Sequence, residues 1–140
     1  MSTFKRLNMK KNLIYKVWGY KERLLETATT VVDILTLKKG GFCSWHYHDF
    51  KYNLFVVLEG KIQIEEDNYT KLLCKGEYYA VSPKLNHRFV AKEKAKIMEV
   101  MYTNPVLEKD IIRLRQGGLI INNEYLTEDE IKKKDKDENK

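Results

Sequence analysis

The sequence lacks several features that would place it in common classes of protein. Its 140 residues contain no run approaching the ~20 apolar residues of a membrane-spanning helix, so no membrane partner is expected. The basic first residues lack the apolar segment of a secretory signal, and we expect a soluble cytoplasmic protein. Cys43 and Cys74 show neither CxxC nor zinc-ribbon spacing. We expect both to be thiols in a reducing compartment, although the sequence leaves one disulfide open.

The chain also lacks a concentrated region of positive charge, although its formal net charge is +6. The most lysine-dense stretch, residues 128–140, interleaves lysines with aspartates and glutamates. Alternating positive and negative charges are typical of a solvated segment, whereas a surface that binds the phosphates of a nucleic acid needs a stripe of positive charge. No nucleic-acid partner is therefore expected, and the partner is expected to be a small molecule.

Helical periodicity is scarce, and most of the chain shows short extended segments separated by turn signals. A hydrophobic content of 43% and this length suit one globular domain. Segments rich in β-branched residues or in alternating polarity occupy residues 29–37, 42–48, 54–58, 61–65, 69–74, 77–81, 87–91 and 96–102. So many short strands without an intervening helix predict an all-β fold, an antiparallel sandwich or barrel.

Three regions are distinguished along the chain. We expect a basic N-terminal arm over residues 1–13, a barrel over 14–116, and a partly disordered C-terminal extension over 117–140. Thr127 and Glu130 have the spacing of a helix capping box. The residues from Ile131 onward include one apolar side chain, so a short polar helical tail that frays is expected.

Histidine is scarce, and its few positions are informative. The only three histidines are His46, His48 and His87. Residues i and i+2 of a strand point to the same face, so His46 and His48 can approach one ion together. His87 begins another predicted strand, and in a rolled sheet it can face the first two. Because neutral imidazole is a common ligand of transition metals, we predict one divalent ion, Zn, Fe, Mn or Ni.

The spacing of glycines around these histidines resembles the two motifs of the cupin family. The first motif is a glycine, five residues and His-x-His, closed here by Val57-Leu58-Glu59-Gly60. The second is a glycine followed eleven residues later by a histidine. The matching positions are Gly40, His46, His48, Gly60, Gly76 and His87. The resemblance implies a double-stranded β-helix, also called a jelly-roll barrel, that binds metal through the three histidines. It also implies a homodimer, to which the N-terminal arm could add a strand.

The sequence departs from the cupin motifs at positions that concern the metal. Asn53 stands where the family usually has a ligand glutamate, so it is expected to be a weak fourth ligand or a hydrogen-bond donor beside the ligands. In the second motif Ser82 replaces a proline, Lys84 a glycine and Ala91 an asparagine. The turn at Lys84 is expected to change if the glycine needed positive φ. Without the glutamate, the predicted site is neutral and open.

Both flanks of the predicted barrel resemble type II mannose-6-phosphate isomerases. Lys16-Val17-Trp18-Gly19-Tyr20 is similar to their Pro-Trp-Gly segment, and residues 109–114 resemble their Asp-Ile-Val-Arg-Leu segment. The Tyr-Gly-Arg that follows in that family is replaced by Arg115-Gln116-Gly117-Gly118. The resemblance implies a sugar-phosphate substrate.

Three functions are compatible with these patterns. The first is a metal-dependent isomerase or epimerase that acts on a sugar phosphate or related polar molecule, and the second is a three-histidine non-haem Fe(II) dioxygenase. The third is a non-catalytic cupin that binds a small ligand. Tyr52, Glu99, Met101 and Tyr102 are candidates for the substrate pocket, and Glu99 for a general base. The fold alone does not decide among these chemistries.

Overall fold

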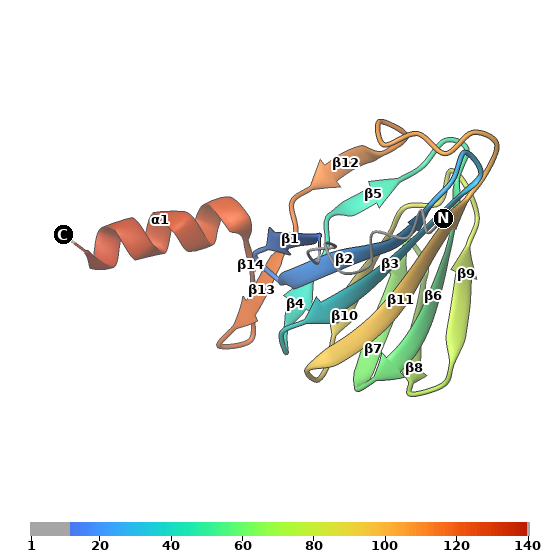
Figure 1. The fold of residues 1–140 in the computed structure, drawn as a ribbon. Coiled ribbons are helices and arrows are strands. Elements are labelled where there is room, and N and C mark those ends of the chain that lie inside the picture. Colours follow the sequence, from blue (N-terminus) through green and yellow to red (C-terminus); the bar gives the residue numbers. More distant parts are fainter. Residues whose placement is uncertain (1–11, 140) are drawn as a thin grey trace, which may run out of the picture.

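The computed structural model describes residues 12–139, so residues 1–11 of the expected N-terminal arm and residue 140 lie outside the described part. Within it, strands follow one another until a single helix, α1 (Glu128–Glu138) (Figure 1). The strands are β1 (Leu13–Lys16), β2 (Gly19–Glu26), β3 (Thr30–Leu37), β4 (Gly41–Phe42), β5 (Trp45–Tyr47), β6 (Tyr52–Glu59), β7 (Lys61–Glu66), β8 (Tyr69–Cys74), β9 (Tyr78–Val81), β10 (His87–Ala91), β11 (Ala95–Tyr102), β12 (Ile112–Arg115), β13 (Gly118–Ile121) and β14 (Glu124–Thr127).

Two antiparallel sheets face each other and enclose the interior (Figure 1). The first has the strand order β1-β2-β3-β11-β6-β9. The second has the order β12-β5-β10-β4-β13-β14, and β7 pairs with both β10 and β8. The predicted all-β jelly-roll fold is confirmed. Each strand predicted between residues 29 and 102 is present, with residues 42–48 divided between β4 and β5.

The alternation of side chains along the strands explains both the core and the position of the polar interior. In β3, every second residue is buried, and Asp33 occupies one of these inward positions between Val31 and Leu35. In β6, Asn53 is followed inward by Phe55 and Val57. Successive residues of a strand point to opposite faces, so one inward row carries both apolar and polar side chains. One end of the interior is therefore an apolar core, and the other end is polar.

The apolar end packs aromatic and aliphatic side chains from both sheets. Trp18 and Phe89 meet edge to face with ring centroids 5.3 Å apart. Contact between the sheets is completed by Leu35, Leu37, Phe55, Val57, Ile62, Ile64, Leu73, Val81 and Ile97, each at most 2% exposed. Burial of these side chains supplies the main favourable free energy of folding and makes the barrel a rigid support for the polar end.

The turn between β9 and β10 keeps a left-handed residue although the motif glycine is absent. Lys84 has φ of 68°, a conformation that a glycine adopts without steric cost. Its backbone N–H donates to the carbonyl oxygen of His48 at 2.6 Å. This hydrogen bond connects the segment that follows β5 to the turn that precedes His87.

The C-terminal extension is joined to the second sheet. Gly118 pairs with Phe42 of β4, and β13 forms a hairpin with β14. These two strands were not predicted. Thr127 caps α1, and both hydrogen bonds of the predicted capping box with Glu130 are present. The residues expected to fray are helical through Glu138, because the cap satisfies the first N–H groups.

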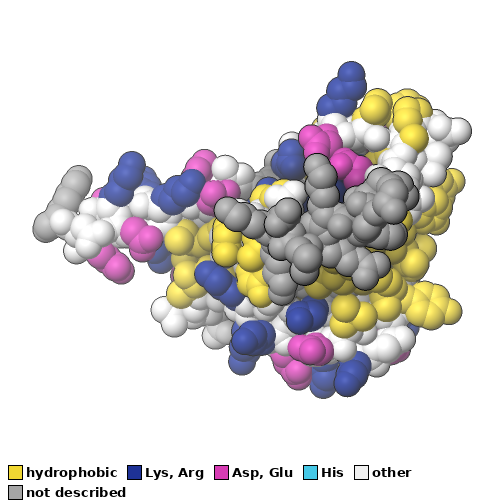
Figure 2. Space-filling model, viewed as in Figure 1, with side chains coloured by type: hydrophobic (Ala, Val, Ile, Leu, Met, Phe, Trp, Pro, Cys, Tyr) yellow, Lys and Arg dark blue, Asp and Glu magenta, His cyan; other side chains and the backbone are white. Residues whose placement is uncertain are grey.

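The helix α1 projects from the barrel and buries none of its residues (Figure 1). Figure 2 shows lysine and acidic side chains interspersed along it. No helix in residues 12–139 has the length and apolar character needed to cross a membrane.

Candidate metal centre

The three histidines converge at the polar end of the barrel. His46 lies in β5, His48 follows that strand, and His87 opens β10, where it pairs in register with His46. Their ring centroids are 4.5–5.4 Å apart, and one ligand nitrogen from each lies within 4.8 Å of the others. All three side chains are buried, at 7%, 3% and 1% exposure. This separation suits three nitrogens around one ion.

Backbone carbonyl groups fix the protonation pattern of all three rings. Nδ1 of His46 lies 2.7 Å from the carbonyl oxygen of Ser44, and Nδ1 of His87 lies 2.8 Å from that of Leu85. Nδ1 of His48 is 2.6 Å from the carbonyl oxygen of Asp110. A carbonyl oxygen only accepts, so each Nδ1 must carry the proton and donate it. Each Nε2 therefore has a free lone pair, as in metal-binding histidines that donate their other nitrogen.

Two of these Nε2 atoms, in His48 and His87, are buried without a hydrogen-bond partner among the described residues. A buried polar atom without a partner costs free energy, so the arrangement is unfavourable unless an additional group is bound. A divalent metal ion fits this donor set, because three neutral imidazole nitrogens are typical ligands of transition metals.

Burial keeps the three imidazoles in the neutral form that can bind a metal. It lowers the pKa of His46 well below its usual range, and the neighbouring His87 and His48 lower it further. Burial also lowers the pKa of His48 to about 4, against the hydrogen bond to Asp110, which raises it. The pKa of His87 is lowered mainly by burial as well. At neutral pH the site therefore presents lone pairs.

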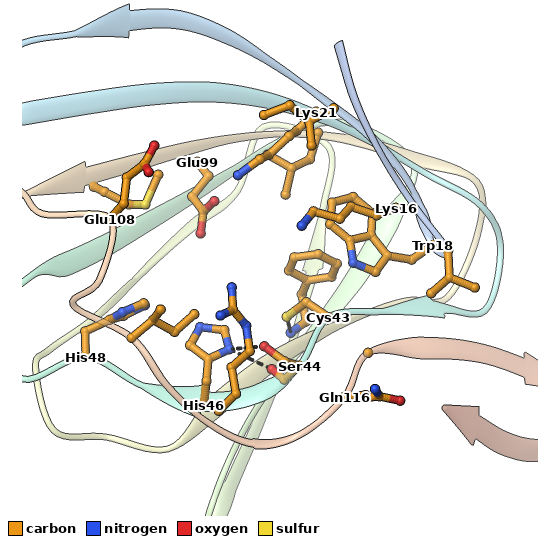
Figure 3. Close-up of a pocket in the computed structure, with 18 of the residues that line it drawn as sticks. Lys16, Trp18, Lys21, Cys43, Ser44, His46, His48, Glu99, Glu108 and Gln116 are labelled. Atoms are coloured by element: carbon orange, nitrogen blue, oxygen red, sulfur yellow. Dashed lines mark hydrogen bonds between the residues drawn. The ribbon is translucent and has the colours of Figure 1, made fainter. Parts of the chain in front are cut away.

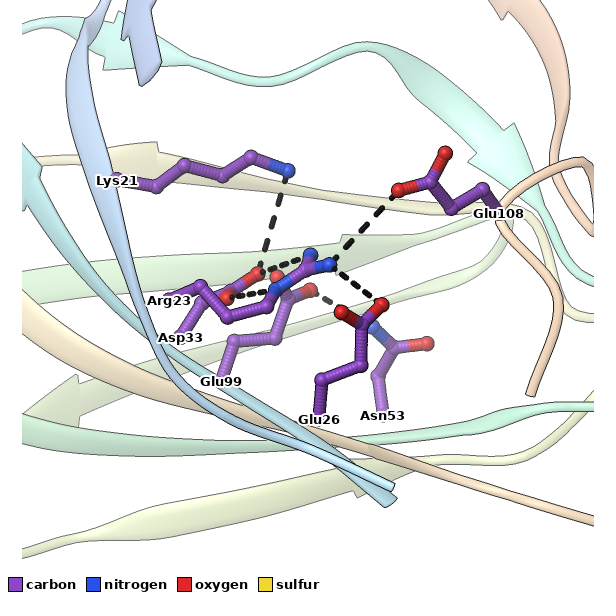
Figure 4. A network of polar contacts seen from close by, with 7 residues as sticks. All are labelled: Lys21, Arg23, Glu26, Asp33, Asn53, Glu99 and Glu108. Carbon is purple, nitrogen blue, oxygen red and sulfur yellow. Dashed lines mark hydrogen bonds and ion pairs between the residues drawn. The ribbon is translucent and has the colours of Figure 1, made fainter. Parts of the chain in front are cut away.

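Asn53 lies on β6, in the sheet opposite the one that contains β5 and β10, and is only 1% exposed. Its Nδ2 donates to Oε2 of Glu99 on β11 at 2.7 Å (Figure 4). This bond fixes the orientation of the amide. Its Oδ1 is buried and has no hydrogen-bond partner among the described residues. An amide oxygen is a metal ligand, so the geometry makes Asn53 both a hydrogen-bond donor and a candidate fourth ligand.

Asp110, 62 residues away from His48 in the chain, holds the loop that follows β5. Its backbone carbonyl accepts the Nδ1 proton of His48. Its carboxylate accepts backbone N–H groups from Asp49 at 2.8 Å, Phe50 at 3.2 Å and Lys51 at 3.0 Å. One residue thus orients a ligand ring and satisfies three donors, so Asp110 positions the site. Nothing in the local spacing indicated this role.

A cavity of about 540 Å³ opens beside His46 and His48 (Figure 3). This volume is in the range of small-molecule sites. Glu99 and Met101, which share one face of β11, are among its lining residues. Tyr52 and Tyr102, predicted for the same pocket, are not among its lining residues. They stack on each other with centroids 5.0 Å apart, because they alternate with inward-facing Asn53 and Met101.

The cavity wall contains charged side chains that no local sequence pattern indicated. Arg23 donates from Nε and Nη2 to the buried carboxylate of Asp33 at 2.9 and 3.2 Å (Figure 4). Lys21 lies 4.0 Å from the same carboxylate, and Arg23 also pairs with Glu26 and Glu108. Figure 3 shows Lys21 entering from the side of the cavity opposite to His46.

Cys43 lines the cavity, but its thiol is not prepared for chemistry. Its Sγ accepts the backbone N–H of Phe89 at 3.2 Å. Burial raises the pKa of the Cys43 thiol to about 12, so it stays protonated and a poor nucleophile. Cys43 and Cys74 are both free thiols, as expected.

Comparison with known proteins tests the predicted family. A family model described as Cupin domain matches residues 33–102, half of the chain. The chain is a cupin. The match runs from β3 to the end of β11 and includes the three histidines, Asn53 and Glu99. A search of curated proteins finds no match.

Solved structures with the same fold come from proteins of different size. Oxalate decarboxylase from Bacillus subtilis has a TM-score of 0.66 and 16% identity, over 74% of this cupin but only 30% of that protein. KdgF from a Halomonas species has a TM-score of 0.64 and 15% identity, over 77% of this chain and 96% of its own. An RmlC-like cupin from Shewanella frigidimarina has a TM-score of 0.64 and 18% identity, over 76% and 91%. At these identities the likeness shows the fold alone.

The lowered pKa of the histidines predicts an acid-labile metal-free protein. In the unfolded chain a histidine titrates near pH 6.5, whereas folded His48 titrates at about 4. The unfolded state therefore binds more protons between these values, and stability is lost as the pH falls through this window. For His48 alone we expect a loss of about 2 kcal/mol between pH 7 and pH 4.5. Urea unfolding of metal-free protein at both values measures it, and equal stability would contradict the assignment.

Proposed function

We propose that this cupin is a metal-dependent isomerase or epimerase that acts on a sugar phosphate or a related polar small molecule. The observation that supports it most directly is that three buried atoms have no hydrogen-bond partner among the described residues: Nε2 of His48, Nε2 of His87 and Oδ1 of Asn53. In each of these side chains the other polar atom donates a hydrogen bond, which fixes the orientation of the side chain. Those three buried atoms and Nε2 of His46 would hold one divalent ion.

Glu99 is the residue proposed to move the proton. Its carboxylate faces the cavity, and burial raises its pKa above the usual range, with Asp33 raising it further. A raised pKa makes a carboxylate a stronger base near neutral pH. The metal, when bound, would supply polarisation of a substrate carbonyl or hydroxyl. Glu99 would accept the proton from the hydroxyl-bearing carbon beside a substrate carbonyl and return it to the carbonyl carbon. The hydroxyl proton of the first carbon would move to the former carbonyl oxygen, so carbonyl and hydroxyl exchange places with no net gain or loss of atoms or electrons.

The resemblance of both flanks to type II mannose-6-phosphate isomerases supports a phosphorylated sugar. One resembling segment contains Asp110, which orients His48, and the other contains Trp18, which lines the cavity. Both segments thus touch the site. The homodimer and the cytoplasmic location expected from the sequence remain predictions.

The proposal is tested on untagged full-length protein loaded in turn with Zn, Fe, Mn or Ni. Hexose and pentose phosphates are incubated with each form, and products are followed by NMR. We expect turnover with at least one metal, and we expect Glu99→Gln to lose it while binding metal normally, because the glutamine oxygen can still accept from Asn53. No turnover and no binding across the panel would contradict the proposal. Oxygen uptake that depends on Fe(II) would instead favour the three-histidine dioxygenase.

A further inference from the structure

We propose that Lys51 and Lys21 form an anion subsite in the metal cavity, which takes the carboxylate or phosphate of a small substrate. This inference rests on the proposed function for the position of the substrate beside the metal. It adds the residues that would recognise the charged part of that substrate.

Lys51 is a buried cation without a direct partner in residues 12–139. It lies three residues after His48, lines the cavity and is 6% exposed. No ion pair or hydrogen bond reaches its ammonium group from the described residues. Arg23 and Arg88, which are also partly buried, each contact a carboxylate at 2.9 Å. A charge that is largely removed from water is costly unless it is paired, so an anion that entered the cavity would stabilise Lys51.

The two carboxylates whose charge acts most on Lys51, Glu99 and Asp110, already accept hydrogen bonds from other groups. Asp110 accepts three backbone N–H groups, and Glu99 accepts the amide of Asn53. Burial is the main cause that lowers the pKa of Lys51. Lys21 and Arg23 lower the pKa further, whereas Glu99 and Asp110 raise it. Lys21 and Lys51 line the same cavity, so an anion bound between their ammonium groups would be attracted by both charges.

The charge of the whole cavity also favours an anion. Its lining includes five cationic side chains and three carboxylates, which are Lys16, Lys21, Arg23, Lys51 and Arg113 against Glu99, Glu108 and Glu128. The pairing of Arg23 with buried Asp33 removes one positive charge from this excess, and a divalent metal would add two. Lys16 and Lys21 enter from the side opposite to His46 and His48 (Figure 3). A ligand could thus reach the metal with one end and lysines with the other.

The test measures binding of inorganic phosphate and of acetate to metal-free full-length protein by calorimetry at constant ionic strength. Lys51→Met removes the ammonium with little change of shape, and Lys71→Met removes an exposed lysine on β8 as the matched control. We expect wild type to bind at least one probe, Lys51→Met to bind it about 10-fold or more weakly, and Lys71→Met to be unchanged. Stronger binding of phosphate would indicate a phosphorylated substrate, and stronger binding of acetate a carboxylated one.

Two further measurements separate the possible failures. Lys51→Met should leave the urea midpoint unchanged or higher, because an unpartnered buried charge is replaced by an apolar group; a clear decrease would show that the ammonium has a structural partner and would overturn the subsite. If Lys51→Met does not fold, Lys51→Gln serves in its place. Equal loss of probe binding in the Lys51 and Lys71 variants, or no binding by wild type, also overturns it. Zinc titration of the same proteins tests the metal site independently of the anion.

Discussion

His87→Ala is expected to weaken metal binding by about 100-fold or more, so that zinc at about 100 times the wild-type Kd fills at most about half of the variant. His87 supplies one of the three candidate ligand nitrogens. It is only 1% exposed, so no surface side chain can readily take its place. Loss of a partner that only orients a ligand weakens metal affinity roughly 10–100-fold, and loss of the ligand itself should cost at least about 100-fold. The effect is measured by zinc titration against a competing chelator.

The same substitution should remove the stabilisation that metal gives to the fold. At a free zinc concentration about 100 times its Kd, wild type gains about 2.7 kcal/mol. A variant with about 100-fold weaker affinity gains only about 0.4 kcal/mol at that concentration. Asn86→Ala, next to His87 but hydrogen-bonded to Asp67 outside the site, is the matched control and should behave as wild type. Equal zinc affinity in His87→Ala and wild type would exclude the proposed centre.

Arg23→Met is expected to produce the largest loss of stability among single substitutions at the cavity wall. Asp33 is 0% exposed, and Arg23 holds both of its carboxylate oxygens. Removal of one partner of a buried pair leaves an uncompensated charge and typically costs about 3–5 kcal/mol. Lys21, 4.0 Å from the same carboxylate, should offset part of this, so we expect about 3 kcal/mol in urea unfolding.

Two companion variants make this expectation specific. Glu26→Gln breaks the pair between Arg23 and the 59% exposed side chain of Glu26. Such exposed pairs contribute about 0–1 kcal/mol, so this variant should remain close to wild type. Arg23→Met combined with Asp33→Leu removes both charges and should recover most of the loss, since a buried pair replaced by apolar groups is often neutral. If the double variant is as unstable as Arg23→Met alone, packing around Arg23 and not the buried charge is responsible.

The sequence by itself determined the fold class and the identity of the three histidines that form the candidate metal cluster. Strand positions follow from alternation of polarity over neighbouring residues, which is a local property, and the structure confirms them between residues 29 and 102. His46 and His48 share a face because they are two residues apart, and the glycine spacing of the cupin motifs placed His87 beside them. The same motifs identified Asn53 as the departure at the position of the family's glutamate.

Only the tertiary structure decided what these residues can do. The bonds between His48 and Asp110 and between Asn53 and Glu99 join residues that are 62 and 46 positions apart, so they depend on how the strands pair and the sheets face each other. No local sequence pattern indicates which residues of paired strands lie opposite each other. The strand pairing also decides that Lys51 and other cationic side chains line the cavity and that Tyr52 and Tyr102 lie outside it. Which atoms are left with free lone pairs depends on long-range hydrogen bonds, and these exist only in the folded barrel.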